Sequence, residues 1–148
     1  MSSPAPFIAI PNARQPAPGL LTGGQPGWDQ LEAALAAGYT FFINTRGHGE
    51  PGVAEAPAFF AAQGVGYAHI PINGPGDLGA ESARALAEAL NQAGDGPTMI
   101  YCGSGNRVGA LLALKAALVD GQSPAAAFKF GVDAGMTALQ PLVRQLLG

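Results

Sequence analysis

Short apolar runs alternate with alanine-rich segments along most of this 148-residue chain. The apolar runs have the length of buried strands and lie at 20–22, 40–44, 65–70 and 98–101. The segments that separate and follow them place Ala and Leu at helical spacing, at 28–37, 57–63, 80–92 and 107–119. Strands that alternate with helices predict an α/β fold, with a central parallel sheet of four to five strands flanked by helices on both faces.

The two ends of the chain carry local signals of their own. Five prolines in the first 18 residues predict an extended Pro-rich segment over 1–18, in which 7–10 is the only plausible strand. Residues 19–148 then form one domain, because no internal repeat or second core is visible. Near the other end, Ser123 before Pro124 predicts a capped helix start, and we expect Thr137 to cap the last helix.

Composition excludes several classes of protein. Hydrophobic residues make up 48% of the chain and charged residues 11%, against roughly 25% charged in average domains, and the net charge is −3. Such a chain is neither disordered nor a general nucleic-acid binder. No apolar run is long enough to span a membrane, and the N-terminus has no secretory pattern. A single cysteine excludes an internal disulfide, so we expect a cytoplasmic protein.

The most informative segment follows the strand at 98–101. That strand delivers the single cysteine, Cys102, to its carboxyl end, where open α/β sheets bind ligands. Four small or polar residues then lead to Arg107, which opens a helix. Two glycines let the backbone N–H groups turn inward as an anion-binding nest, and the helix N-terminus and the guanidinium add positive charge. We expect this phosphate-binding loop to consist of Gly103, Ser104, Gly105, Asn106 and Arg107.

This setting favours the thiolate form of Cys102, because a sulfur beside a helix N-terminus and an arginine loses its proton easily. A thiolate in an anion cradle suits attack on a phosphate monoester, and it also suits carriage of a persulfide sulfur. The simpler interpretation is a structural cysteine, since free cysteine is a common core residue. The strand end, the glycine-rich loop and the helix-opening arginine coincide here, which favours a functional cysteine.

Four segments together resemble the phosphatase-like domains of bacterial beta-lactamase-hydrolase-like proteins, within the dual-specificity and tyrosine phosphatase superfamily. They are LTGGQP at 21–26, INTRGHGE at 43–50, HIPI at 69–72 and YCGSGNR at 101–107. The resemblance runs from about Gly19 to the C-terminus. It implies a cysteine-phosphatase-like domain with a four-stranded parallel sheet, in which Cys102 is the nucleophile and Arg107 clamps the phosphate.

The chain departs from the signature of that superfamily in three places. Four residues separate Cys102 from Arg107, where the signature has five, and four is a length also seen in rhodanese loops. Val108 stands where a Ser or Thr hydroxyl usually bonds the thiolate, and Tyr101 stands where many phosphatases have His. The long helical tail after Arg107 looks more like a phosphatase than a rhodanese.

Other polar residues are expected near the same sheet edge. The resemblance implies that Asp77, in the loop after the third of these strands, protonates the leaving oxygen, although a carboxylate there also suits the first turn of the next helix. Arg46 and Glu50 follow the strand at 40–44 and are expected to pair and brace the site, with direct anion contact by Arg46 left open. We interpret His69 as a core histidine, and the two histidines do not make a metal site.

These arguments predict a cysteine-dependent phosphatase-like hydrolase that needs no metal or cofactor. Its substrate would be a phosphorylated small molecule or a phosphoprotein, and neither a nucleic acid nor a membrane is an expected partner. Two alternatives stay open, a rhodanese-like sulfurtransferase that carries a persulfide on Cys102 and a non-catalytic anion-binding module. The sequence makes no prediction of the oligomeric state.

Overall fold

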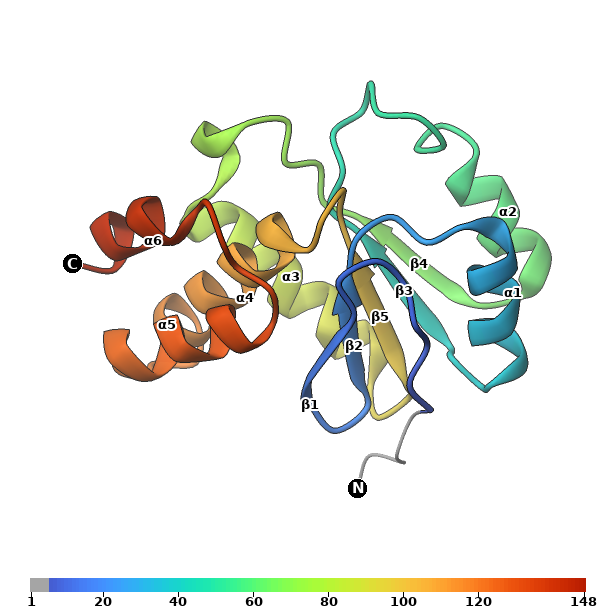
Figure 1. Cartoon of the computed structure of the whole chain (residues 1–148), viewed down its shortest axis with the longest axis horizontal. Helices are drawn as coiled ribbons and strands as arrows, with labels where there is room; N and C mark the ends of the chain where they lie inside the picture. Colours follow the sequence, from blue (N-terminus) through green and yellow to red (C-terminus); the bar gives the residue numbers. More distant parts are fainter. Residues whose placement is uncertain (1–5) are drawn as a thin grey trace.

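The alternating pattern of the sequence produces a sheet between two layers of helices, as the computed structural model of residues 6–148 shows (Figure 1). The strands are β1 (Arg14–Ala17), β2 (Leu20–Gly23), β3 (Phe41–Asn44), β4 (Gly66–His69) and β5 (Thr98–Tyr101). The helices are α1 (Trp28–Ala36), α2 (Ala56–Gln63), α3 (Ala80–Ala93), α4 (Asn106–Leu118), α5 (Pro124–Asp133) and α6 (Gln140–Leu147), with a 3-10 turn at Pro75–Asp77.

The sheet has the strand order β1-β2-β5-β3-β4, and the last four of these strands are parallel to one another. The predicted α/β fold with a parallel four- to five-stranded sheet is therefore confirmed. The fifth strand, β1, is antiparallel to β2 and lies at the edge of the sheet. Sequential parallel strands separated by helices explain why the helices cover both faces.

The expected strand at 7–10 is wrong, because the edge strand forms at Arg14–Ala17 instead. Ile10 packs its side chain into the core from an irregular segment, and Asn12 turns the chain with a positive φ of 54°. The β1–β2 register is irregular between Arg14 and Ala17, the stretch that holds Pro16. A proline that cannot donate to the ladder is tolerated in an edge strand of this kind.

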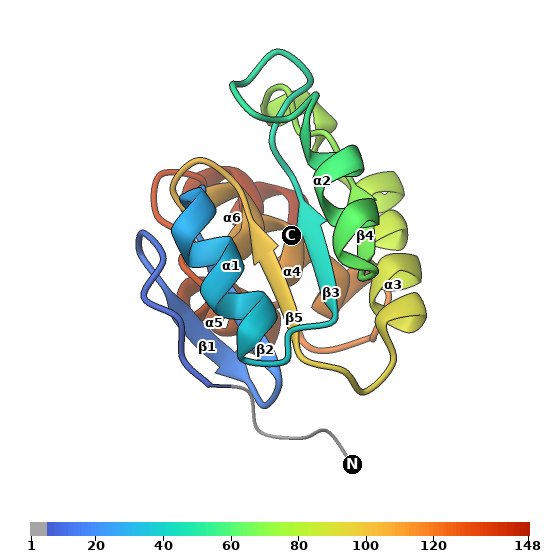
Figure 2. The same cartoon turned by 90° about the vertical axis from the view of Figure 1, so that its right-hand side faces the viewer.

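Each strand sends alternate side chains into two separate hydrophobic layers. In β3, Phe41 and Ile43 join a cluster with α3 and α4, whereas Phe42 joins a cluster with α1 and α2. Figure 2 shows α1 and α2 on one face of the sheet and the C-terminal helices on the other. All four residues of β3 and of β5 are buried, which is the burial expected of central parallel strands.

The helix ends follow the sequence signals in part. Ser123 caps α5, since its side-chain oxygen accepts a hydrogen bond from the Ala126 N–H. The expected cap at Thr137 is wrong, because α6 begins at Gln140 and Leu139 holds the cap position. The Thr137 N–H is instead bonded to a side chain at the start of α4, as described below. None of the helices among residues 6–148 is long and apolar enough to cross a membrane.

Candidate active site

The carboxyl ends of the four parallel strands meet at one edge of the sheet. The register pairs Gly23 with Tyr101, Tyr101 with Asn44, and Asn44 with His69, so four loops leave this edge side by side. One of them carries Cys102, and another carries the segment with Arg46 and Glu50. The edge is the place where ligands of α/β sheets bind, which makes it the candidate active site.

The loop after β5 closes around the sulfur of Cys102. The backbone N–H of Cys102 donates to the Gly23 carbonyl at 3.1 Å, which extends the hydrogen-bond ladder between β2 and β5 to the cysteine. The Gly105 N–H donates to Cys102 Sγ at 3.0 Å, and Gly105 has a left-handed φ of 95° that favours glycine. Cys102 has none of its surface exposed to solvent. Of the backbone N–H groups expected to form a nest, that of Gly105 is thus bonded to the sulfur itself.

The segment that precedes α1 supports this loop from the side. The Gln25 N–H donates to the Gly103 carbonyl at 3.4 Å, and the Asn12 amide donates to the Ser104 carbonyl at 2.9 Å. A Cβ at Gly24 would lie only 2.6 Å from the Gly103 oxygen, so glycine is needed at this close approach. The LTGGQP segment therefore acts as a buttress of the loop.

Arg107 is held in one orientation by three acceptor atoms. Its Nη1 and Nη2 donate to the two carboxylate oxygens of Glu50 at 2.6 and 2.9 Å, and Nη1 also donates to the Ile72 carbonyl at 3.1 Å. The pKa of Arg107 is raised, chiefly by its hydrogen bond with Glu50 and also by the charge of Cys102. A Cβ at Gly103 would lie 3.0 Å from Nη2. The guanidinium therefore lies directly against the cysteine loop.

Glu50 is shared by two arginines. Besides its bidentate contact with Arg107, it lies 3.4 Å from Nε of Arg46 and accepts the Gly47 N–H. These contacts, led by the Arg107 hydrogen bond, lower the pKa of Glu50 to about 2 although partial burial opposes the shift. Glu50 thus stays ionised at any physiological pH, and one carboxylate orders both guanidinium groups.

Arg46 is almost fully buried and bonded to protein groups. Its Nη1 donates to the Gln25 side-chain oxygen at 2.6 Å and to the Pro51 carbonyl. Its Nε has no hydrogen bond, because the approach to Glu50 has the distance of an ion pair without hydrogen-bond alignment. The expected Arg46–Glu50 pair is present within the loop after β3. The hydrogen bond from Arg46 to Gln25 connects this loop to the LTGGQP segment.

The two histidines lie beside this network. His69 Nε2 is 2.7 Å from the Arg46 carbonyl, so this nitrogen carries the proton and donates it. The His48 ring lies edge-on to His69 with centroids 5.1 Å apart. His69 is hydrogen-bonded as expected, but it is half-buried rather than a core residue. Within residues 6–148, no group of three or more His, Cys, Asp or Glu side chains could hold a metal ion.

Asp77 ends the 3-10 turn in the loop after β4. Its Oδ2 accepts the Asn73 N–H at 2.9 Å, and the Asn73 side-chain oxygen accepts the His48 N–H at 3.0 Å. Asp77 lines a pocket of about 410 Å³ together with Glu81 at the start of α3, whereas the pocket that borders Arg107 is lined by other residues of the same loop, 72–75 and Leu78. The Asp77 carboxylate is therefore directed to its own loop in this structure.

Two residues of the expected phosphate loop have further structural roles. Asn106 is the first residue of α4, and its Oδ1 accepts the N–H groups of Thr137 and Leu139 at 2.8 and 3.2 Å. Ser104 is exposed, and its backbone pairs with Gly24. Val108, the residue that follows Arg107 in α4, is buried. The turn before α6 is thus joined to the loop that surrounds the cysteine.

Sequence reasoning missed the partners that complete this site. Asn12 and the Ile72 carbonyl contact the network from distant parts of the chain. The sequence left open whether the segment with Gln25 packs beside the loop or forms a plain turn, and the structure shows the contact. Glu50 was expected to pair with Arg46 but not to hold Arg107, which lies 57 residues away in sequence. The glycines at 23 and 24 were the only local sign that this segment approaches the loop closely.

Solved structures with the same fold are phosphatases. A DUF442 protein of Shewanella putrefaciens, named as a candidate phosphatase, is 23% identical, with 93% of this chain and 87% of the other covered and a TM-score of 0.73. A candidate phosphatase of Neisseria meningitidis is 21% identical, with coverage of 90% and 94% and a TM-score of 0.72. The catalytic core of the Saccharomyces cerevisiae PP-IP phosphatase SIW14, solved with citrate, is 18% identical, with coverage of 97% and 89% and a TM-score of 0.67.

These likenesses, all below 25% identity, establish the cysteine-phosphatase fold. No curated protein gives a significant match to the sequence. The model of one family does match, over residues 14–119, which is more than half of the chain and includes β1 through α4 with Cys102, Glu50 and Arg107. On that match the chain belongs to the family described as the phosphatase-like domain of beta-lactamase-hydrolase-like proteins.

Proposed function

We propose that this protein hydrolyses phosphate monoesters through a phosphocysteine intermediate on Cys102. The observation that carries the proposal is the placement of the Arg107 guanidinium, which Glu50 holds in a bidentate pair against the loop that surrounds the sulfur. A planar guanidinium beside inward-facing N–H groups matches the oxygens of a phosphoryl group. The family and the solved phosphatases of the same fold support this chemistry.

The proposed reaction has two steps. The Cys102 thiolate attacks phosphorus, the S–P bond forms, and the P–O bond to the leaving group breaks. Water then attacks the phosphocysteine, the S–P bond breaks, and inorganic phosphate leaves with the thiolate restored. Arg107 and the backbone N–H groups of 103–107 bind the nonbridging oxygens through both steps, so that charge developing on them is stabilised.

Asp77 is the acid that we propose for the first step. Its loop also supplies part of the pocket that borders Arg107, so a modest rearrangement of the turn would bring the carboxylate toward the leaving oxygen. The hydrogen bond that it now accepts from Asn73 would then break. A protonated carboxyl group that donates to the leaving oxygen makes the alcohol or phenol a better leaving group.

Two features of the site bear on the rate. Cys102 has no exposed surface, so a phosphoryl group reaches Sγ only when the loop widens or the Arg107 guanidinium moves aside. Val108 offers no hydroxyl to bond the thiolate as it departs from phosphorus. We therefore expect slow turnover, with breakdown of the intermediate as the slower step.

The sulfurtransferase alternative rests on one observation, the four-residue spacing between Cys102 and Arg107. A persulfide would add a single sulfur atom to Cys102 inside the same cradle. The anion-binding alternative rests on the full burial of the thiol.

Hydrolysis of aryl phosphates by the purified protein and by Cys102→Ser tests the three functions together. The variant keeps the shape of the side chain but has no thiolate, so we expect its kcat to fall by about a thousandfold or more. Circular dichroism of both proteins controls for folding. Equal hydrolysis by the two proteins would overturn the phosphatase proposal, thiosulfate:cyanide transfer would favour the sulfurtransferase, and phosphate binding without turnover would favour the anion-binding module.

A further inference from the structure

A pocket opens next to the Arg107 guanidinium, between the loop after β4, the start of α4 and the turn before α6. Its volume is about 290 Å³, near the lower limit for small-molecule sites in proteins. Most of its wall is apolar and comes from Ile72, Pro75, Leu78 and Leu139. A pocket of this size and lining is suited to the organic part of a small phosphate ester.

The polar groups in the pocket wall are two amides. The side-chain oxygen of Asn73 is taken by the His48 N–H, and that of Asn106 is taken by the N–H groups of Thr137 and Leu139. Each amide can still offer its NH₂ group, which is a donor, and the Asn73 oxygen keeps one lone pair. The wall contains no carboxylate, and its one charged residue is Arg107.

The charge of Arg107 is already balanced in part. Glu50 holds it in a bidentate pair and also contacts Arg46, which leaves this cluster of three charges with a net charge of +1. One phosphoryl group, with a charge of about −1.5 to −2 at neutral pH, already exceeds that charge. A second phosphoryl group on the same substrate would need another cation within reach of the pocket.

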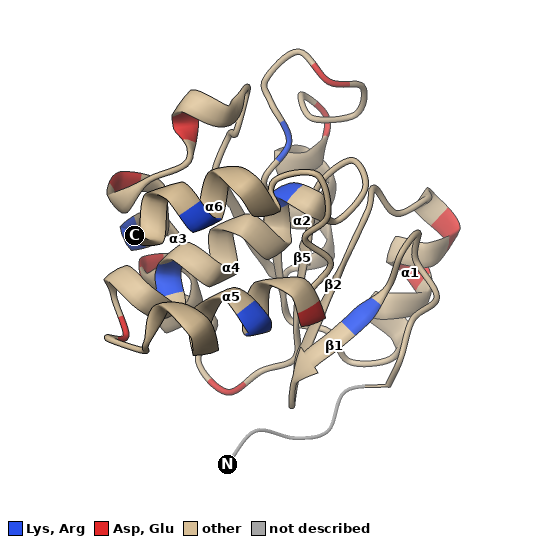
Figure 3. Ribbon diagram, turned by 60° about the vertical axis from the view of Figure 1, so that its left-hand side comes forward, with Lys and Arg blue, Asp and Glu red and all other residues tan. Residues whose placement is uncertain are grey.

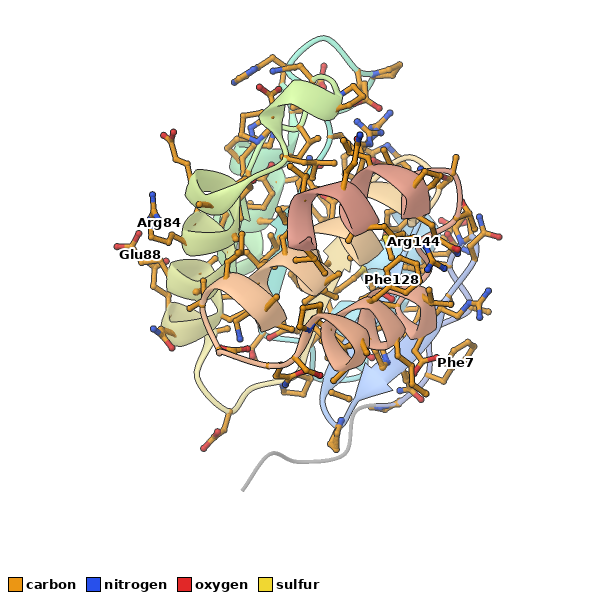
Figure 4. The ribbon with its side chains drawn as sticks, turned by 90° about the vertical axis from the view of Figure 1, so that its left-hand side faces the viewer. Phe7, Arg84, Glu88, Phe128 and Arg144 are labelled. Carbon is orange, nitrogen blue, oxygen red and sulfur yellow. The ribbon has the colours of Figure 1, made fainter. Side chains whose placement is uncertain are left out.

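The remaining five Lys and Arg residues of the chain lie away from the pocket, and Figure 3 shows how sparse the charged residues are along the ribbon. Lys115, in the last turn of α4, pairs with Asp120, and Lys129 pairs with Asp133 on α5. Figure 4 shows the other two on helices, Arg144 over the ring of Phe128 and Arg84 beside Glu88 on α3, and Arg14 is in the edge strand β1. None of these five lines the pocket.

One wall of the pocket comes from outside the segment matched by the family model. That match ends at residue 119, whereas Leu139 belongs to the turn before α6. Asn106 holds this turn in place through its two hydrogen bonds. A Cβ atom added to Gly135 would lie 3.3 Å from the Gly105 carbonyl oxygen. The C-terminal segment is therefore packed directly on the loop of the candidate site.

We propose that the substrate carries a single phosphoryl group on an uncharged, mainly apolar remainder, and that Leu139 is a specificity-determining residue for that remainder. This inference rests on the proposed phosphatase function, since it assigns the pocket to the leaving group of the same reaction. It separates this protein from an enzyme for multiply phosphorylated substrates, although the SIW14 phosphatase has a similar fold.

Binding to the Cys102→Ser protein tests the pocket without any need for turnover. The probes are phenyl phosphate, glycerol phosphate and inositol hexakisphosphate, measured by calorimetry at one ionic strength. We expect phenyl phosphate to bind at least about tenfold more tightly than glycerol phosphate, because only the phenyl ring buries apolar surface. Equal binding of those two, or tightest binding of the hexakisphosphate, would overturn the inference.

Substitution of Leu139 tests the residue itself. In the Cys102→Ser background, Leu139→Lys should weaken phenyl phosphate by about fivefold and strengthen the hexakisphosphate by a similar factor, since it adds a cation to the wall. Leu139→Gln adds no charge and should weaken only phenyl phosphate, which covers the case in which the lysine variant folds poorly. Leu146→Lys, at an exposed position of the following helix α6, is the matched control and should change neither.

The outcomes separate the two proposals. Absence of any Cys102-dependent hydrolysis, with phenyl phosphate still preferred in binding, would contradict the proposed function and leave the assignment of the pocket intact. Cys102-dependent hydrolysis that is fastest on multiply phosphorylated substrates, or unaffected by both Leu139 variants, would contradict this inference and leave the phosphatase function standing.

Discussion

Two positions near the start of α4 are held in place by different forces. Arg107 is fixed by a carboxylate and a carbonyl from two other loops. Gly109, two residues further on, lies where the backbones of α4 and of the segment around Gly131 and Met136 come so close that only glycine fits. A Cβ at Gly109 would lie 2.3 Å from the Met136 nitrogen.

This difference separates what the helix does for the fold from what it does for the site. Where two backbones touch, an added side-chain atom cannot be accommodated by a change of rotamer, because the contacting atoms belong to the main chain. A charge network on the partly exposed end can lose one member while the helix stays where it is. Changes at Gly109 should therefore affect folding, and changes to the partners of Arg107 should affect the reaction.

The largest effect is expected from Gly109→Ala. The added methyl group must push the α5 backbone away, and the gain of about 1 kcal/mol in helix propensity does not offset that. We expect the free energy of unfolding to fall by about 2 to 3 kcal/mol, as measured by urea denaturation.

Gly49→Ala is the matched control for this prediction. A Cβ at Gly49 would meet nothing within 4 Å, so its stability should change by less than about 0.5 kcal/mol. Equal effects of the two alanine substitutions would show that α4 is not held by the close approach to Gly131.

Glu50→Gln should produce the next largest effect, and on the reaction rather than on folding. The amide keeps the size of the side chain but offers one acceptor oxygen and no charge, so Arg107 loses its bidentate partner. We expect kcat/KM for phenyl phosphate to fall by about tenfold to a hundredfold through misplacement of the guanidinium.

The control for Glu50 is Glu55→Gln, an exposed glutamate that precedes α2. It should leave kcat/KM unchanged, and Glu50→Asp should restore part of the loss because it returns the charge. If Glu50→Gln were as active as the unaltered protein, the positioning role of this carboxylate would be wrong.

The smallest expected effect is a dependence of stability on pH. The pKa of Glu50 is lowered from 4.5 to about 2 in the folded protein, chiefly by Arg107. A lowered pKa means that its stabilising contribution is complete above the unfolded value and is lost as the pH falls from about 4.5 to about 2. The unfolding midpoints of the unaltered protein and Glu50→Gln should therefore differ by a constant amount above about pH 5 and converge between about pH 4.5 and pH 2. A constant difference over that range would show that the Arg107–Glu50 pair does not contribute to stability.

Much of the fold was predictable because its strands and helices are marked by local patterns. The strand at 98–101 and the start of α5 after Ser123 match the sequence signals residue for residue. The edge strand β1 was not predictable, since Arg14 and Gln15 beside Pro16 show no alternation of apolar and polar residues. It forms because its backbone pairs with β2, and a pattern of side chains carries no trace of that pairing.

The same distinction between local patterns and long-range contacts applies to the candidate site. Cys102, the glycine loop and Arg107 are adjacent in sequence, so their chemistry could be inferred from one short segment. The hold of Glu50 on Arg107 and the supply of a pocket wall by Leu139 depend on how distant loops meet, which a single sequence does not show. A single sequence likewise does not show that the Trp28 ring packs against Phe59 and leaves about half of the Trp28 surface open.

The most direct test of the central claim is the chemical state of Cys102 during turnover. The protein is mixed with an aryl phosphate, quenched rapidly in acid, and the peptide that contains Cys102 is weighed by mass spectrometry. The account predicts a phosphoryl group on that cysteine, which accumulates because the intermediate breaks down slowly. An unmodified Cys102 in a sample that is releasing phosphate, or phosphate found on another residue, would contradict it.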